Sequence, residues 1–248
     1  MKSIKIFQKI KVNYLTLYFL LISFLCGYIK NACIIFFIVI FHELGHVVIC
    51  KIFKYKINSI EIFPFGGVTK IDKLLNDSII KDLLISIMGI IFQLIIFLIT
   101  DNLVVLKYNK YIMLFNLLPI IPLDGSKILF EIYALIMPYK KVIKYYYLTS
   151  FIFIIIYFIF NYKYNLNNYM IIILFIYKTI EVIKNRNILY EKFILERALY
   201  DIKFNKVKNK NEDINKYLKD TKYYYKYNNK IISDKEYLKN KYYLDKHK

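Results

Sequence analysis

Long apolar stretches, separated by short polar segments, dominate the first 184 residues of the chain. A helix needs roughly 20 apolar residues to cross the hydrocarbon core of a bilayer, and several stretches are near the lower limit. The pattern predicts an all-α polytopic membrane protein with about six transmembrane helices. The expected spans are at about residues 13–29, 31–50, 79–100, 111–137, 146–160 and 168–184.

Residues 57–71 depart from the helical pattern, because apolar residues alternate with polar ones on both sides of a turn at Pro64 to Gly67. Alternation with period two is typical of strands, and proline and glycine favour a turn. A short β-hairpin or re-entrant loop is therefore expected after the second span, with a plain connecting loop as the alternative. The edge of such a hairpin could pair with an extended peptide by strand addition.

The character of the chain changes at about residue 185. Residues 185–200 are typical of an amphipathic helix, and residues 201–248 are rich in Lys, Asn and Tyr. The pattern predicts two parts: a six-span membrane domain over residues 1–184 and a basic cytosolic C-terminal segment over residues 185–248, small or partly ordered.

The net charge of +19 could indicate a nucleic-acid partner, but the basic residues gather at the ends of the apolar stretches, as cytoplasmic anchors do. We therefore expect a lipid bilayer and no nucleic acid. Lysine-rich segments alternate with lysine-poor ones, which predicts that both termini are cytosolic. The N-terminal stretch has the outline of a signal peptide but no A-x-A-like cleavage site, so we expect an uncleaved first span.

The second apolar stretch contains the motif His-Glu-Leu-Gly-His, with His42, Glu43 and His46. Two histidines four residues apart lie on one helix face and can bind one metal ion, with the glutamate beside it as a general base. This is the signature of a metalloprotease. Its apolar setting indicates function, because ionisable groups are costly in hydrocarbon. Cys50, farther along that helix, is expected to be a buried apolar residue rather than a ligand.

A second motif interrupts the fourth apolar stretch, where Asn116, Pro119, Pro122, Asp124 and Gly125 follow one another. Irregular backbone at membrane depth is tolerated only where it is buried in protein or lines a wet cavity. Asp124 there would be costly without a metal or a partner. With His42 and His46 it would complete an N, N, O ligand set that leaves a fourth zinc position for water. Glu61 is the alternative third ligand.

Together, the two motifs resemble the site-2 protease family of intramembrane zinc metalloproteases, and within it the stage IV sporulation protein FB branch. Pro64-Phe65-Gly66-Gly67 and the segment Phe193 to Arg197 support the resemblance, which covers roughly residues 1–200. It implies that His42, His46 and Asp124 bind zinc and that Glu43 is catalytic. The motif residues that would position the loop or the substrate are Asn116, Pro119, Pro122 and Gly125.

Two features depart from the family pattern. The third span often has Gly-Pro followed by a polar residue, whereas this chain has Gly89-Ile90 and then Gln93, which could serve as a polar contact or only pack between helices. Relatives in this branch also carry a cystathionine-β-synthase-type regulatory domain. Only about fifty residues remain here after Tyr200, which suggests at most a shortened version.

The resulting hypothesis is an intramembrane zinc endopeptidase. By resemblance, its substrate would be a membrane-associated inactive pro-sigma factor processed during sporulation, on the mother-cell side of the membrane around the forespore. Membrane proteins would act as its inhibitors or activators. A non-catalytic scaffold or pseudoprotease is the alternative, and a metal transporter is less consistent with the few acidic residues in the apolar stretches.

Overall fold

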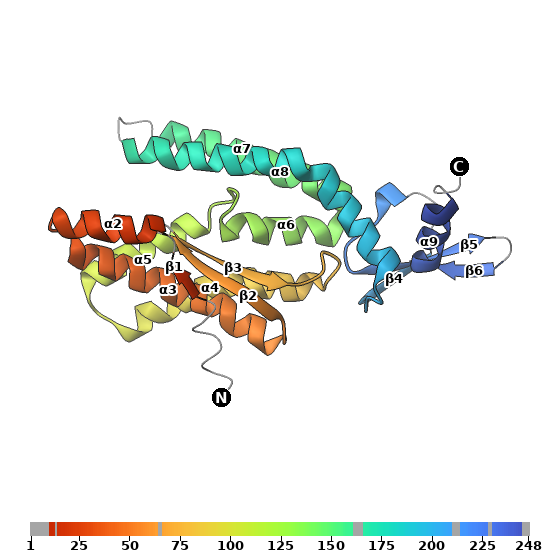
Figure 1. Cartoon of the computed structure of the whole chain (residues 1–248), viewed down its shortest axis with the longest axis horizontal. Coiled ribbons are helices and arrows are strands. Elements are labelled where there is room, and N and C mark those ends of the chain that lie inside the picture. Colours follow the sequence, from red (N-terminus) through yellow and green to blue (C-terminus); the bar gives the residue numbers. More distant parts are fainter. Residues whose placement is uncertain are drawn as a thin grey trace. The chain divides into compact units, whose positions relative to one another are not determined.

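The computed structural model describes residues 10–12, 14–63, 66–160, 166–209, 214–227 and 230–244. The chain forms two compact units. The first contains Met1–Lys73 and Leu84–Leu117, and the second contains Leu74–Leu83 and Leu118–Lys248. Figure 1 gives the labels of the helices and strands.

The helical part of the first unit consists of α2 (Tyr14–Leu25), α3 (Ile29–Ile52), α5 (Leu103–Asn116) and the residues of α4 (Ile79–Ile99) from Leu84 onward. The close approach of α3 to α4 depends on Gly45, where an added Cβ would lie 2.5 Å from the carbonyl oxygen of Met88. Small residues permit such backbone approach between membrane helices. The glycine of the His-Glu-Leu-Gly-His motif is thus a packing residue.

A three-stranded sheet completes this unit, in the order β1 (Ile10–Val12), β2 (Lys56–Phe63) and β3 (Gly66–Asp72). Strands β2 and β3 are antiparallel, and β1 pairs with β2 in parallel. The expected hairpin is therefore confirmed, although Pro64 and Phe65 at its turn lie outside the described residues. The sheet packs on α3 through a cluster that includes the fully buried Cys50, which agrees with its expected apolar role.

Helices α6 (Asp124–Ile136), α7 (Tyr139–Phe160) and α8 (Leu166–Leu199) belong to the second unit, and α7 packs along α8 (Figure 1). The irregular segment before α6 is attached to this pair. The backbone N–H of Ile121 donates to Ser150 Oγ on α7 at 3.0 Å, and that hydroxyl lies 3.0 Å from the hydroxyl of Thr179 on α8. The first of these bonds gives the backbone N–H of Ile121 an acceptor, which the interrupted helix does not provide.

The C-terminal part of the second unit is folded. Strands β4 (Lys206–Asn209), β5 (Thr221–Tyr227) and β6 (Lys230–Ser233) form a sheet in that order, with a 3-10 turn η1 (Ile214–Lys216) and a final helix α9 (Asp234–Leu244). Its core is aromatic, with Tyr217, Tyr223 and Tyr225 buried against Phe193 of α8. The tyrosine-rich composition of this region is therefore the composition of a packed core.

Three differences from the sequence-based expectations concern the elements. The apolar stretch at 111–137 is two helices, α5 and α6, separated at the proline segment. The expected amphipathic helix at 185–200 is the continuation of α8. The second sheet makes the class helical with two small sheets rather than all-α with one hairpin. Among the described residues, α3, α4 and α7 are long and apolar enough to cross a membrane.

Candidate metal centre

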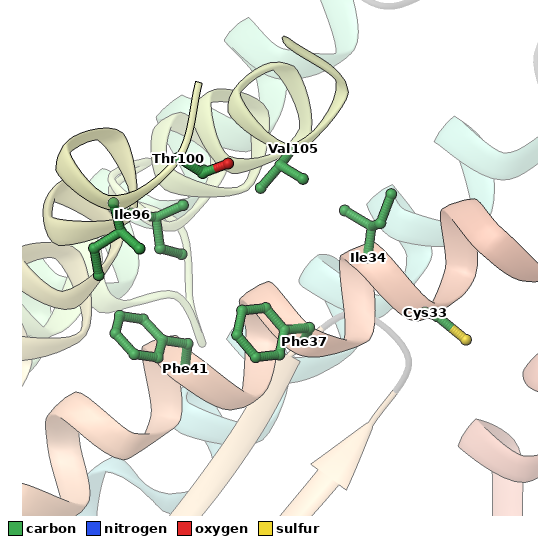
Figure 2. Close-up of a pocket in the computed structure, with 8 residues that line it drawn as sticks. Cys33, Ile34, Phe37, Phe41, Ile96, Thr100 and Val105 are labelled. Carbon is green, nitrogen blue, oxygen red and sulfur yellow. The ribbon is translucent and has the colours of Figure 1, made fainter. Parts of the chain in front are cut away.

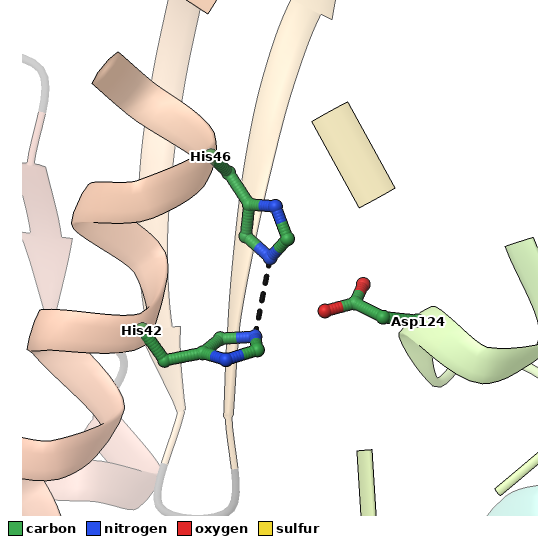
Figure 3. A group of neighbouring side chains, drawn as sticks. All are labelled: His42, His46 and Asp124. Atoms are coloured by element: carbon green, nitrogen blue, oxygen red, sulfur yellow. Dashed lines mark hydrogen bonds between the residues drawn. The ribbon is translucent and has the colours of Figure 1, made fainter. Parts of the chain in front are cut away.

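The two histidines of the motif face the same side of α3, and both are buried. Their Nε2 atoms lie 3.1 Å apart (Figure 3). Two nitrogens bound to one zinc ion at 2.0–2.1 Å in tetrahedral geometry are roughly 3.3 Å apart. The separation in this helix therefore fits a shared zinc ion.

The hydrogen bonds of the two Nδ1 atoms bear on whether the Nε2 atoms have lone pairs that can bind a metal. His46 Nδ1 donates to the backbone carbonyl of Ile85 at 2.7 Å, and His42 Nδ1 lies 3.0 Å from Gln93 Oε1. Both partners on α4 are oxygen atoms, which accept, so a neutral ring that donates from Nδ1 to such an oxygen directs its Nε2 lone pair at the other ring. Two lone pairs at this distance repel unless a cation lies between them, and metal-binding histidines are oriented by such second hydrogen bonds.

Gly89 and Gln93 on α4 thus have clear roles that the sequence pattern left open. An added Cβ at Gly89 would lie 2.5 Å from His42 Cε1 and 2.6 Å from His46 Nε2, so a larger residue would displace the rings. Gln93 is fully buried and orients His42, and its own backbone oxygen accepts from Asn109 Nδ2 at 2.8 Å. Gln93 is therefore a positioning residue and not only a packing residue.

Glu43 is also buried, and it faces strand β3. Thr69 Oγ1 donates to Glu43 Oε2 at 3.2 Å. An added Cβ at Gly67 would lie 2.4 Å from Glu43 Cγ, so only glycine allows the strand to pass this close to the carboxylate. The hairpin therefore brings an edge strand and a hydroxyl donor to the candidate catalytic base.

In the second unit, Asp124 is the first residue of α6 and is buried. An acidic residue at a helix N-terminus is favoured by the helix dipole. Lys127, one turn later, lies 2.7 Å from Asp124 Oδ1 and is half exposed. Among the described residues, the candidate metal ligands are His42, His46 and Asp124, which are drawn together in Figure 3. Two imidazoles and one carboxylate match the donor set of a catalytic zinc ion.

The remaining predicted residues have varied surroundings. Glu61, the alternative ligand, pairs with Lys70 at 2.7 Å on the hairpin, and this ion pair lowers the pKa of its carboxyl group. Gly125 is buried in the first turn of α6. Asn116 ends α5 and is half-buried, as is Pro119, whereas Pro122 is exposed.

A separate cavity of about 370 Å³ lies in the first unit among α3, α4 and α5 (Figure 2). It is lined by apolar side chains such as Phe37, Phe41 and Ile96, and its polar groups are the Thr100 hydroxyl and the Cys33 thiol. This lining suits an apolar group and offers no acid–base chemistry.

Residues 31–108, which include most of α3, the hairpin and α4, match the model of Peptidase family M50. This part of the chain is therefore similar to Peptidase family M50. The match bears out the resemblance for the residues that it covers, which include His42, Glu43, His46 and Gln93 but not the second motif at 116–125.

Two curated proteins resemble the chain. It is 26% identical to stage IV sporulation protein FB of Bacillus subtilis over 191 residues, covering 71% of the chain and 66% of that protein. It is 33% identical to a zinc metalloprotease of Methanocaldococcus jannaschii over 111 residues, covering 39% of the chain and 32% of that protein. The chain thus spans just under two thirds of the first relative and about a third of the second.

Among solved structures, the chain is similar to a site-2 protease from Methanocaldococcus jannaschii. The TM-score is 0.47 at 23% sequence identity, and the match covers 78% of this chain and 92% of that one.

Proposed function

We propose that this protein is an intramembrane zinc endopeptidase. The observation that carries the proposal is the pair of imidazoles whose Nε2 lone pairs face each other at 3.1 Å, next to a buried glutamate, on a helix that is long and apolar enough to cross a membrane. The M50 match and the two relatives support the same activity.

His42, His46 and Asp124 would hold the ion, and the donor set leaves one tetrahedral position for water or substrate. Zinc lowers the pKa of bound water to about 7 and polarises a carbonyl oxygen. Joining the histidines of the first unit and Asp124 of the second at one ion is part of this proposal. It predicts that Asp124→Ala weakens zinc binding, whereas Glu61→Ala does not, because Glu61 is paired with Lys70.

Glu43 would act as general base and then as general acid. Its carboxylate would accept a proton from the attacking water and deliver it to the leaving amine, a contribution of typically 10²–10⁴-fold in rate. Thr69 holds one carboxylate oxygen, which leaves the other available for proton transfer. Strand β3 is an edge of its sheet in the described part of the chain, so an extended peptide could pair with it next to Glu43.

As substrate we propose a membrane-associated pro-protein, specifically an inactive pro-sigma factor cleaved during sporulation. The support is the motif-level resemblance to the sporulation branch and the similarity to stage IV sporulation protein FB. We propose in addition that the enzyme crosses the membrane several times with both termini cytosolic, on the mother-cell side. Membrane partner proteins would control its activity.

The test is co-expression with a candidate pro-sigma factor, followed by immunoblotting of the processed form and by zinc analysis of the purified enzyme. Wild type should cleave the substrate, whereas Glu43→Gln should reduce cleavage by about 10²–10⁴-fold while retaining about one zinc ion per chain. Full activity of Glu43→Gln would refute the assignment of the base. Zinc-loaded wild type that cleaves no pro-sigma factor but cleaves another membrane peptide would refute only the substrate.

A further inference from the structure

We propose that a basic pocket between α7 and α8 binds the phosphate head group of an anionic phospholipid. The pocket has a volume of about 410 Å³ and lies within the second unit. Its charged lining consists of Lys140, Lys144 and Arg186 with a single carboxylate, Glu191. Three cations against one anion give the pocket an excess of positive charge, which favours an anionic ligand.

The helix spacing explains why these side chains converge. Lys140, Lys144 and Tyr147 follow one another at intervals of four and three residues, so they lie on one face of α7. Arg186 and Tyr190 are four residues apart on the facing side of α8. The two helices therefore place cations on opposite walls of one pocket rather than scattering them over the surface.

Part of the pocket is held in place by η1, which contains Ile214 and Asn215. Lys140 Nζ donates to Asn215 Oδ1 at 2.9 Å and lies 5.6 Å from the centre of the Tyr190 ring. The hydroxyl of Tyr190 donates in turn to the backbone oxygen of Ile214 at 3.0 Å. Lys144 and Arg186 form no ion pair with a carboxylate within the part of the chain that the structure describes. Both cations are therefore available to a ligand.

Position along the helices favours a lipid over a soluble anion. Lys140 is 20 residues from Phe160 at the other end of α7, and Arg186 is 20 residues from Leu166 at the start of α8. Twenty helical residues extend about 30 Å, the thickness of the hydrocarbon core. With the remainder of α7 in hydrocarbon, Lys140 would lie at the level of the lipid head groups, and Arg186 lines the same pocket from α8.

The surface beyond the pocket fits an acyl chain. Phe151 continues the pocket face of α7 by one turn beyond Tyr147 and is half exposed, and Ile180 on α8 is similarly exposed. A basic pocket with exposed apolar side chains farther along the same two helices matches an amphipathic ligand with a charged head and a hydrocarbon tail. Basic pockets between membrane helices on the cytoplasmic side are known to bind anionic lipid head groups.

The test uses the purified full-length protein and native mass spectrometry with phosphatidylglycerol and phosphatidylcholine of matched acyl chains. The variant K140Q/K144Q/R186Q removes the pocket cations. The control K141Q/K184Q/K192Q removes three exposed lysines of the same two helices that do not line the pocket. We expect the first variant to lose phosphatidylglycerol affinity at least tenfold and the control to lose less than twofold, with phosphatidylcholine binding unchanged in both.

Equal losses in the two variants would show diffuse attraction to the basic surface and would overturn the pocket. Displacement of phosphatidylglycerol by millimolar inorganic phosphate or ATP would show a soluble phosphate ligand and would overturn the lipid assignment. The conservative variant K140R/K144R/R186K, which keeps the charge, should retain the affinity, and a loss there would also count against a head-group site.

Discussion

At the scale of single residues, the candidate centre depends on which ring nitrogen of each histidine carries the proton. Ile85 and Gln93 accept from the two Nδ1 atoms, and this leaves both Nε2 atoms ready for a metal before any metal arrives. Such partners usually contribute 10–100-fold to metal affinity. Gln93 is the partner that can be varied, because Ile85 acts through its backbone.

Gln93→Leu should therefore weaken zinc binding by about 10–100-fold, since it removes the acceptor at similar volume. Gln93→Glu should keep the affinity, because a carboxylate also accepts from Nδ1–H. Chelator competition on the purified protein measures both. A zinc affinity of Gln93→Leu equal to that of wild type would mean that Gln93 only fills space between α3 and α4.

At the scale of elements, a buried network ties α6 to the turn before β5. Lys219 Nζ, from the turn before β5, lies 2.6 Å from Asp82 Oδ2 on α4 and 2.7 Å from Glu131 Oε2 on α6. Burial opposes the charge, yet the two carboxylates raise the pKa of Lys219 above its usual range. A second connection runs through Arg197 at the end of α8, which donates to Asn76 Oδ1 at 2.6 Å and pairs with Asp234 at 3.1 Å.

Lys219→Met should destabilise the fold by about 3–5 kcal/mol, because it leaves two carboxylates buried without their partner. The triple variant D82N/E131Q/K219M should recover most of that loss, and Lys208→Met on exposed β4 serves as the control. Thermal unfolding in detergent measures all three. Because the raised pKa keeps the lysine charged, its contribution should persist through neutral pH and decline only above about pH 10.4. Wild-type stability of Lys219→Met would show that the network contributes nothing.

At the scale of the whole molecule, the charge pattern predicts how the helices cross the membrane. Lys70 follows α3 on the hairpin and Lys141 lies in the first turn of α7, whereas Asp101 lies between α4 and α5, and all three are exposed. In a background without Cys26, Cys33 and Cys50, cysteines at 70 and 141 should react with an impermeant thiol reagent only from the cytosolic side. A cysteine at 101 should react only from the opposite side.

Labelling of position 101 from the cytosol would mean that α4 does not cross the membrane, and the number of spans would then differ. Labelling of position 141 from outside would instead reverse α7 and would also place the basic pocket on the wrong side for the cytosolic leaflet. The experiment therefore tests each half of the topology separately.

Much of the site was predictable from local sequence. The four-residue spacing places His42 and His46 on one face of any helix, and an alternating apolar pattern around a proline–glycine turn specifies the hairpin. The boundary near residue 184 between a membrane domain and a C-terminal segment stays a prediction. These features need only the chain's own periodicity, which is why they are visible without a structure.

The tertiary structure decided what depends on residues far apart in the chain. The contacts of Gln93 and Gly89 with the histidines, and the fit of Gly67 against Glu43, follow from how α4 and β3 pack on α3. The order of the second sheet and its surroundings follows from packing of buried tyrosines and from the burial of Lys219 against two distant acids. Composition alone indicated a basic tail there, because it records the charges but not the partners that neutralise and bury them.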